Sequence, residues 1–391
     1  MRPLRRVALA LGVVAWPPLA SLDLHADRRP VVETVDAQVP VPPVAVTVAG
    51  RTHVVHELHV TNVLTKDVWL DGVDVLRTDG SRGLVATHRG DDLRARIGRP
   101  GLPRRHETPH VIGPGLRAVV HFWFPLPDGE RPPAGLRHRL FLRIAPPDGT
   151  PLAVETASVP VDRAESLLLG PPLSGGPWAA IYDPVLKGGH RTVAYAVDGR
   201  ARIPGRFAID FVQLPASRVF AANPREIPPG WNGEGTDVLA VADAVVAAAA
   251  DDMPDNPPPS ERPRAPMALE DASGNHVVLD LGGGRYAFYE HLQNRSVAVQ
   301  PRQRVRRGQV VGRLGNSGSS SIGPHLHFHV ADADAPLAAE GRPFVFAAFD
   351  ELGAFASLDA LVGGSPWKDA AGGTVTRRHE RPAPMAVIRF R

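Results

Sequence analysis

The stretch VRRGQVVGRLGNSGSSSIGPHLHFHV spans residues 305–330 and carries the densest chemistry of the chain. A Gly/Ser-rich loop leads into a strand-like segment with His325, His327 and His329. On a strand, residues two apart point to one face, with Cα atoms about 6.5 Å apart. Two neighbouring imidazoles can converge on one zinc ion, or one binds it while the other contacts its water. The outer pair is about 13 Å apart, so the central His327 is the best ligand candidate.

Two more residues elsewhere in the chain strengthen this prediction. Asp210 lies in RFAIDF, between Ile209 and Phe211, on an apolar strand-like segment. A carboxylate there is costly to bury unless it is paired, hydrogen-bonded or bound to metal. His291 lies in YEHL, just after a hairpin-like GGGR turn at 282–285. The three regions together predict a metal site on a β-sheet.

Four stretches resemble, in family order, the catalytic domain of LytM/lysostaphin-type zinc metallopeptidases. They are AIDF, TDVLAVADAVV, YEHL, and VRRGQVVGRLGNSG leading to GPHLHFHV, and the resemblance covers about residues 181–335. It implies a compact antiparallel sheet with a groove over the metal, and cleavage of peptide bonds in bacterial peptidoglycan. It also implies one zinc ion with Asp210 and His327 as ligands. His291 and His325 would then be the catalytic, non-ligand histidines, which activate the water and stabilise the oxyanion.

The sequence departs from this family at one ligand. The family places its first zinc-binding His four residues before the Asp, and this position is Arg206 here. An arginine stays protonated and offers a metal no lone pair. The usual three-ligand set therefore lacks one member.

Three interpretations of Arg206 remain open. In the first, His190 replaces the missing ligand: an antiparallel hairpin of 190–197 and 204–212, centred near residue 200, places His190 opposite Asp210, about 5 Å away. A slip of one residue in that register turns His190 away. In the second, Arg206 pairs with Asp210, and the site is metal-free and inert. In the third, Asp210, His327 and waters bind zinc weakly.

The chain begins like a secretory signal peptide. Three arginines in MRPLRR precede a ten-residue apolar run, Val7–Trp16, and two prolines with small residues follow. The run is shorter than the roughly 20 residues of a membrane-spanning helix. We predict that residues 1–26 are a signal peptide and that the protein is exported, to the periplasm or the extracellular space, with no membrane association after cleavage.

Composition narrows the possible chemistry and partners. The chain has 391 residues and no cysteine, which excludes disulfides, thiol nucleophiles and thiolate metal ligands. Its 44 basic and 41 acidic residues are interspersed and leave a net charge of +3. We see no basic stripe with interleaved aromatic residues, so no nucleic-acid partner is predicted.

The fold is predicted to be all-β. In residues 27–165, period-two apolar runs separated by turn clusters predict an immunoglobulin-like β-sandwich. Residues 166–180 are rich in Pro and Gly and are predicted to be a linker. A LytM-like antiparallel β-sheet domain is expected over 181–350. Residues 351–391 are a C-terminal tail without an assigned role.

Two functions of different class follow. The first is an exported zinc metalloendopeptidase that hydrolyses peptide bonds in peptidoglycan, with peptidoglycan peptides as its substrate. The second is a catalytically degenerate LytM-like module that binds cell wall or regulates a partner hydrolase. Arg206 motivates the second, because it removes a ligand that the first requires.

Overall fold

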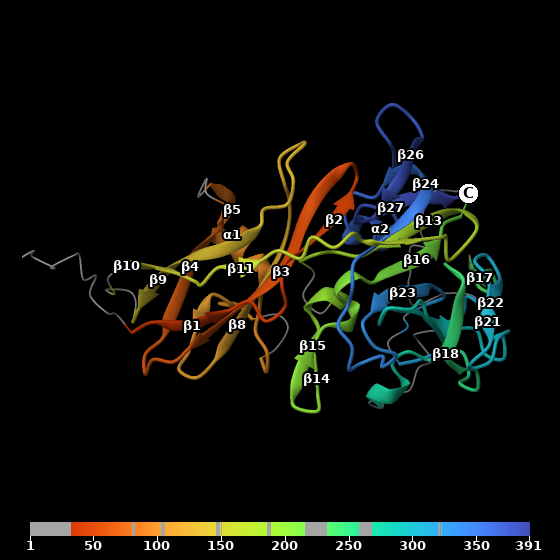
Figure 1. Cartoon of the computed structure of the whole chain (residues 1–391), viewed down its shortest axis with the longest axis horizontal. Helices are drawn as coiled ribbons and strands as arrows, with labels where there is room; N and C mark the ends of the chain where they lie inside the picture. Colours follow the sequence, from red (N-terminus) through yellow and green to blue (C-terminus); the bar gives the residue numbers. More distant parts are fainter. Residues whose placement is uncertain are drawn as a thin grey trace, which may run out of the picture. The chain divides into compact units, whose positions relative to one another are not determined.

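Antiparallel strands dominate the computed structural model, which confirms the predicted all-β class (Figure 1). The structure describes residues 33–79, 83–102, 106–145, 149, 151–185, 189–215, 233–257, 268–319, 321 and 323–391. The predicted signal peptide, residues 1–26, lies outside the described residues. No helix in the described ranges has the length and apolarity needed to cross a bilayer.

The front half consists of two antiparallel sheets around a shared apolar core. The first sheet contains β1 (Val35–Gln38), β2 (Val44–Val48), β3 (Arg51–Asn62), β6 (Ile97–Gly98) and β8 (Arg117–Pro125). The second contains β4 (Val68–Arg77), β5 (Leu84–Arg89), β7 (Val111–Ile112), β9 (Gly135–Ile144), β10 (Pro151–Glu155) and β11 (Val159–Pro160), and α1 (Gly90–Arg96) follows β5.

Alternation of side chains builds this front core. Leu58 and Phe122 from the first sheet and Val73 and Leu140 from the second are fully buried in one cluster. Successive side chains of a strand point to opposite faces, so the period-two runs supply one apolar face per sheet. The immunoglobulin-like topology of this region stays a prediction.

A larger sheet forms the rest of the described chain. Its strands pair in the order β12 (Leu167–Leu169), β24 (Phe344–Ala354), β27 (Ala386–Phe390), β13 (Gly175–Ile181), β16 (Ile209–Gln213), β23 (Leu326–Ala331), β20 (Tyr286–Leu292), β19 (Asn275–Asp280), β18 (Ala244–Ala250) and β21 (Arg304–Val305). Next to β24 lie β25 (Lys368–Asp369) and β26 (Val375–Glu380). Smaller elements are β14 (Tyr195–Val197) with β15 (Arg200–Arg202), β17 (Asp237–Leu239) with β22 (Val310–Arg313), α2 (Leu358–Val362), and the 3-10 turns η1 (His190–Thr192), η2 (Pro204–Phe207) and η3 (Leu269–Asp271).

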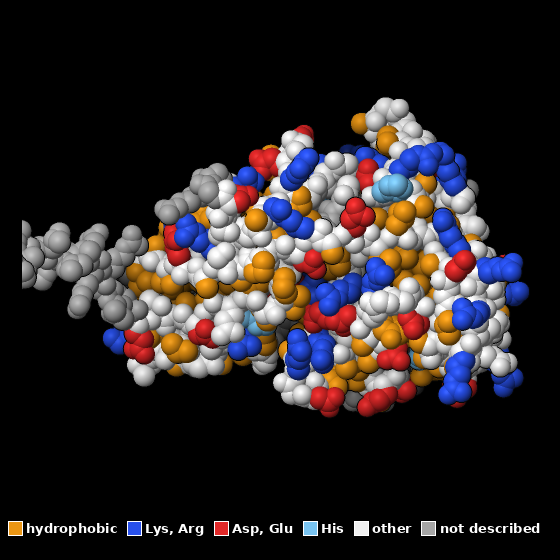
Figure 2. Space-filling model, viewed as in Figure 1, with side chains coloured by type: hydrophobic (Ala, Val, Ile, Leu, Met, Phe, Trp, Pro, Cys, Tyr) orange, Lys and Arg blue, Asp and Glu red, His pale blue; other side chains and the backbone are white. Residues whose placement is uncertain are grey.

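The segments predicted as linker and tail both contribute strands to this sheet. Within 166–180, β12 pairs with β24, and β13 lies between β27 and β16. Trp178 on β13 is fully buried, so this Pro/Gly-rich segment is ordered by its apolar side chains rather than acting as a spacer. The tail adds β25, β26, β27 and α2, and Leu361 packs in one apolar cluster with Val212 of β16. Basic and acidic side chains are interspersed over the face shown in Figure 2.

Candidate metal centre

Three adjacent strands align polar side chains in one row. Asp210 on β16 is paired with His327 on β23, and His327 is paired with Glu290 on β20. Residues opposite each other on neighbouring strands project to the same face, with Cβ atoms about 5 Å apart. His327 Nδ1 accordingly lies 2.9 Å from Asp210 Oδ1. Two of the predicted ligands are therefore brought together by strand register alone.

The predicted hairpin before Asp210 has a different register. β14 and β15 pair Tyr195 with Arg202, and the turn is Asp198-Gly199, with φ of 51° and 72°. Two consecutive residues with positive φ are typical of a type I′ turn, which Asp-Gly favours. The hairpin is thus centred between residues 198 and 199, not near residue 200, and Pro204 opens η2 where the second strand was expected to continue. The predicted strand pairing of His190 with Asp210 is wrong.

His190 nevertheless reaches Asp210 by another path. It begins the 3-10 turn η1, and its Nε2 lies 2.8 Å from Asp210 Oδ2. The turns η1 and η2 pack closely at Gly205, where an added Cβ would lie 2.9 Å from the Cβ of His190. Such a contact requires the neighbour to shift, so the absence of a side chain at Gly205 permits this approach of His190.

These three residues fit a metal ion chemically. The ligand atoms of His190, Asp210 and His327 all lie within 4.8 Å of one another. Two imidazoles and one carboxylate, with a further position open, form a donor set of catalytic zinc sites. Burial disfavours charge on Asp210, but His190 and His325 outweigh it and hold the pKa of this carboxyl well below its usual value. The carboxylate is therefore ionised and ready to act as a ligand.

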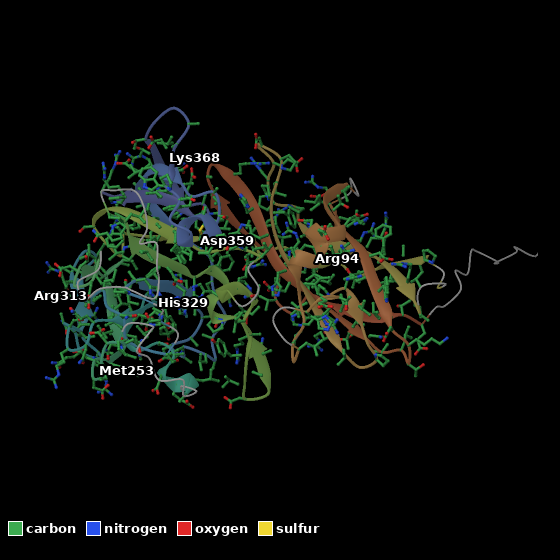
Figure 3. All side chains as sticks on the ribbon, turned by 180° about the vertical axis from the view of Figure 1, so that it is seen from behind. Arg94, Met253, Arg313, His329, Asp359 and Lys368 are labelled. Atoms are coloured by element: carbon green, nitrogen blue, oxygen red, sulfur yellow. The ribbon has the colours of Figure 1, made fainter. Side chains whose placement is uncertain are left out.

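The second ring nitrogen of His327 faces a different pair of side chains. His327 Nε2 lies 3.1 Å from His329 Nδ1 and 3.9 Å from Glu290 Oε2, and these three residues also form a group with metal-ligand spacing. The ring of His329 stacks on Phe288 with centroids 4.5 Å apart, and Figure 3 labels His329 on its strand. If His327 were to bind a metal through Nδ1, its Nε2 proton would be donated to His329 Nδ1 at 3.1 Å, as outer partners of ligand histidines usually accept it. Glu290 at 3.9 Å is beyond hydrogen-bond distance and adds a nearby negative charge.

Sequence reasoning did not single out Glu290. Its signal was present, because an acidic residue in the apolar run YAFYEHL is as unusual as Asp210 in RFAIDF. Glu290 is buried, and its place opposite His327 depends on the pairing of β20 with β23.

The two predicted catalytic histidines, His291 and His325, lie side by side at this site. Their ring centroids are 4.8 Å apart. His291 has a φ of 64° at a register irregularity between β19 and β20, which breaks the strand alternation directly after Glu290. Such a bulge re-aims a side chain, so Glu290 and His291 both line the same pocket.

Backbone carbonyls set the tautomers of both histidines. His291 Nδ1 lies 2.9 Å from the carbonyl of Ser317, and His325 Nδ1 lies 2.7 Å from that of Gly323. A carbonyl only accepts, so Nδ1 carries the proton and Nε2 is the acceptor nitrogen in each ring. Burial lowers the pKa of both histidines, which are therefore neutral near pH 7. His325 Nε2 lies 3.6 Å from Asp210 Oδ1, so an acceptor nitrogen faces the predicted ligands.

Arg206 has other partners than the predicted Asp210. Its guanidinium contacts Glu57 Oε2 at 2.9 Å and Glu340 Oε1 at 2.5 Å, and it is buried. The predicted Arg206–Asp210 pair is thus replaced by two carboxylates from other strands and loops. Asp210 instead contacts His190 and His327, so the Arg206–Asp210 pair of the metal-free interpretation is not formed.

A cavity of about 600 Å³ opens beside the histidines. Its polar lining includes Asp210, His291, His325 and His327. Its apolar lining includes residues of β16 and the tail: Val212, Leu358, Leu361, Val362 and Met385. Asp359, labelled in Figure 3, marks α2 in this lining. The volume and the mixed lining suit a short peptide segment.

An antiparallel sheet that carries paired histidines and an aspartate on one face is the type of site that zinc hydrolases use. Residues 231–339 match the description Peptidase family M23. This match confirms the resemblance to the LytM/lysostaphin-type metallopeptidases over residues 231–339.

Several solved structures of M23 proteins show weak similarity to the chain. A mutant of the catalytic domain of the prophage-encoded M23 protein EnpA from Enterococcus faecalis is 17% identical, with 44% of this chain and 92% of that chain covered and a TM-score of 0.26. The catalytic domain of lysostaphin from Staphylococcus simulans is 18% identical, with 43% of this chain and 88% of that chain covered and a TM-score of 0.23. The deep-sea M23 metalloprotease pseudoalterin is 14% identical, with 57% of this chain and 96% of that chain covered and a TM-score of 0.28.

Proposed function

We propose that this protein is an exported zinc-dependent endopeptidase that hydrolyses peptide bonds in bacterial peptidoglycan. One observation carries the proposal: His190 Nε2 lies 2.8 Å from Asp210 Oδ2, beside His327. His190 would supply the third donor that Arg206 cannot supply. The M23 match and the signal-like N-terminus support the substrate class and the export.

The proposed site residues divide into ligands and proton carriers. His190, Asp210 and His327 would hold one zinc ion, which lowers the pKa of water toward about 7 and polarises a carbonyl when bound. His325 and His291 would act on the water and the substrate. Their Nε2 atoms are the acceptor nitrogens, so either can take the proton of the attacking water.

The same histidines suit the later stages of hydrolysis. Once protonated, an imidazole can donate to the developing oxyanion or to the leaving amine. The carbonyls of Ser317 and Gly323 keep the Nδ1 protons and hold the ring orientation throughout. Since burial keeps both rings neutral beforehand, the site begins the reaction in the form that accepts a proton.

The second candidate function is that of a non-catalytic binding module with the same fold. In it, the domain binds cell wall, or regulates a partner hydrolase, and does not cleave. Arg206 at a family ligand position favours this alternative, as does the attached β-sandwich, which offers contact surface rather than a catalytic group.

The decisive experiment combines metal content with cleavage. The purified full chain is dialysed, its zinc is measured by elemental mass spectrometry, and it is incubated with muropeptides with and without a chelator. We expect about one zinc per chain and products that disappear on chelation. His327→Ala should lose both zinc and cleavage, and His325→Ala should lose cleavage but keep zinc. His276→Ala, on β19, is the matched control and should keep both.

The non-catalytic alternative predicts binding to cell wall without cleavage. Binding to intact sacculi without any product, in zinc-replete buffer, would favour the non-catalytic module. Unchanged cleavage by His327→Ala and His325→Ala would reject the proposed site.

A further inference from the structure

A buried ionic network connects Arg206, at the position of the missing family ligand, to the two sheets of residues 35–160, here called the front sandwich. Glu57 on β3 accepts from Arg206 at 2.9 Å and from Arg191 at 3.0 Å, and Arg206 also pairs with Glu340. All four residues are buried, and two carboxylates balance two guanidiniums. Burial opposes ionisation of Glu57, but Arg206 and Arg191 outweigh it and lower its pKa from 4.5 to about 2. The network is therefore charged and internally neutralised.

Arg191 is anchored in the front sandwich by more than this ion pair. Its Nη2 donates to the carbonyls of Phe122 at 2.6 Å and His56 at 3.0 Å, which belong to β8 and β3. Its guanidinium carbon lies 5.5 Å from the ring centre of Trp123, also on β8. A buried guanidinium bound by carbonyls and a carboxylate has one well-defined position, because each alternative leaves buried charge unpaired.

This anchor adjoins His190 in the sequence. His190 and Arg191 are consecutive residues of the 3-10 turn η1, so the placement of one backbone constrains the other. Arg206 lies in η2, whose Gly205 packs against His190. The turn that contains His190 and the turn that packs against it therefore each contribute an arginine that pairs with Glu57.

The other two predicted ligands are held differently. Asp210 and His327 are paired residues in the interior of the large sheet, and strand hydrogen bonds position them without the front sandwich. Only His190 depends on a turn whose main anchors lie outside the sheet.

We propose that Glu57 is a positioning residue for His190: through Arg191 and Arg206, the front sandwich completes the zinc site. This inference rests on the proposed function, because it assumes that His190 is a zinc ligand. It assigns the front sandwich a role within the site, in addition to any contact with substrate. It also explains why an arginine is compatible with a family ligand position here.

The test measures zinc affinity, by competition with a chromogenic chelator, on the full chain. We expect Glu57→Gln to weaken zinc binding by roughly 10–100-fold, the range seen when residues that orient ligands are replaced. The double variant Glu57→Gln/His190→Ala should bind zinc no more weakly than His190→Ala alone. Glu155→Gln is the matched control, since Glu155 also pairs with an arginine of the sandwich, at 2.6 Å, away from η1. It should leave zinc affinity unchanged.

The absorption spectrum of bound Co²⁺ reports the loss of a particular ligand, which a general loss of stability would not reproduce. The Co²⁺ absorption spectrum of Glu57→Gln should match that of His190→Ala, because both have lost the same ligand. Should Glu57→Gln fail to fold, Arg191→Lys is the second variant, since it keeps a buried cation beside Glu57 but loses the planar guanidinium. Circular dichroism identifies the folded variants.

The outcomes are distinguishable. Wild-type zinc affinity and cobalt spectrum in the folded variants would overturn the inference, and so would losses that add to that of His190→Ala. A wild-type chain that binds no zinc would instead reject the proposed function on which the inference rests.

Discussion

His190 and Asp210 lie 20 positions apart in the sequence, and their side chains meet at 2.8 Å. The contact is made by a 3-10 turn packed against a second one, not by paired strands. Asp210 thereby has an imidazole on each side, with His327 at 2.9 Å. This arrangement brings three possible metal donors together in a chain that has Arg206 at the position of the family's first zinc-binding His.

Gly205 should be essential for this contact. In Gly205→Ala, the new Cβ would lie 2.9 Å from the Cβ of His190 and would displace η1. We expect weaker zinc binding and a loss of about 1–3 kcal/mol in unfolding free energy, as is typical of overpacking. Zinc titration and denaturant unfolding measure the two effects. Gly113→Ala, where the nearest atom is 3.4 Å away, is the control, and equal losses in both variants would contradict the prediction.

His325→Ala should separate catalysis from metal binding. His325 Nε2 faces Asp210 at 3.6 Å, and its Nδ1 is held by Gly323. We expect hydrolysis to fall by about 10²–10⁴-fold, the usual contribution of a general base or acid, while zinc content stays unchanged. Kinetics on muropeptides and elemental analysis of the same preparation provide the measurement. A variant that loses zinc in parallel with activity would identify His325 as a ligand instead.

Acid should weaken the network around Glu57. The folded-state pKa of Glu57 is about 2 against an ordinary 4.5, so its ion pairs contribute fully above pH 4.5 and are lost as the pH falls toward 2. The contribution is roughly 3 kcal/mol, on the basis of 1.36 kcal/mol per pKa unit. Urea unfolding of wild type and Glu57→Gln between pH 6 and 2.5 measures it. We expect the difference between the two chains to shrink with acid, and a constant difference would be evidence against it.

A buried histidine pair should make the front sandwich sensitive to mild acid. His56 Nε2 and His138 Nε2 are 2.8 Å apart, and both rings contact Phe122. Burial lowers the pKa of His138 from 6.5 to about 4. A depressed histidine pKa favours the folded state above pH 6.5, and this stabilisation is lost as the pH falls from 6.5 toward 4, by up to roughly 3 kcal/mol.

The variant His138→Phe tests this sensitivity. It removes one of the two protons that unfolding takes up, so the unfolding free energy should fall less between pH 6.5 and 4.5 than in wild type. Thermal or urea unfolding across that range measures the slope. His276→Ala, on β19 of the large sheet, is the comparison variant. An unfolding free energy that falls as steeply with acid in His138→Phe as in wild type would refute the role of His138 in this acid sensitivity.

The sequence predicted much of this site from local pattern. The spacing of His325 and His327 places both on one face of a strand in any β-fold, because side chains alternate along the backbone. Asp210 and Glu290 each stand out as acids in apolar runs, and the predicted site includes only Asp210. The Asp198-Gly199 pair is also a local signal, because Asp-Gly favours a type I′ turn. It places the hairpin centre between residues 198 and 199, and therefore excludes the strand pairing of His190 with Asp210.

The sequence alone therefore determined the all-β class, the polar face of the β23 strand and the types of donor available for a metal. The tertiary structure decided which of these groups meet. Pairing of β16, β23 and β20 aligns Asp210, His327 and Glu290, and two turns bring His190 to the same carboxylate. The partners of Arg206 were also decided there, because Glu57 is 149 positions away in the sequence. Local spacing encodes which side of a strand a residue faces, whereas contacts of this separation arise only when sheets and turns pack together.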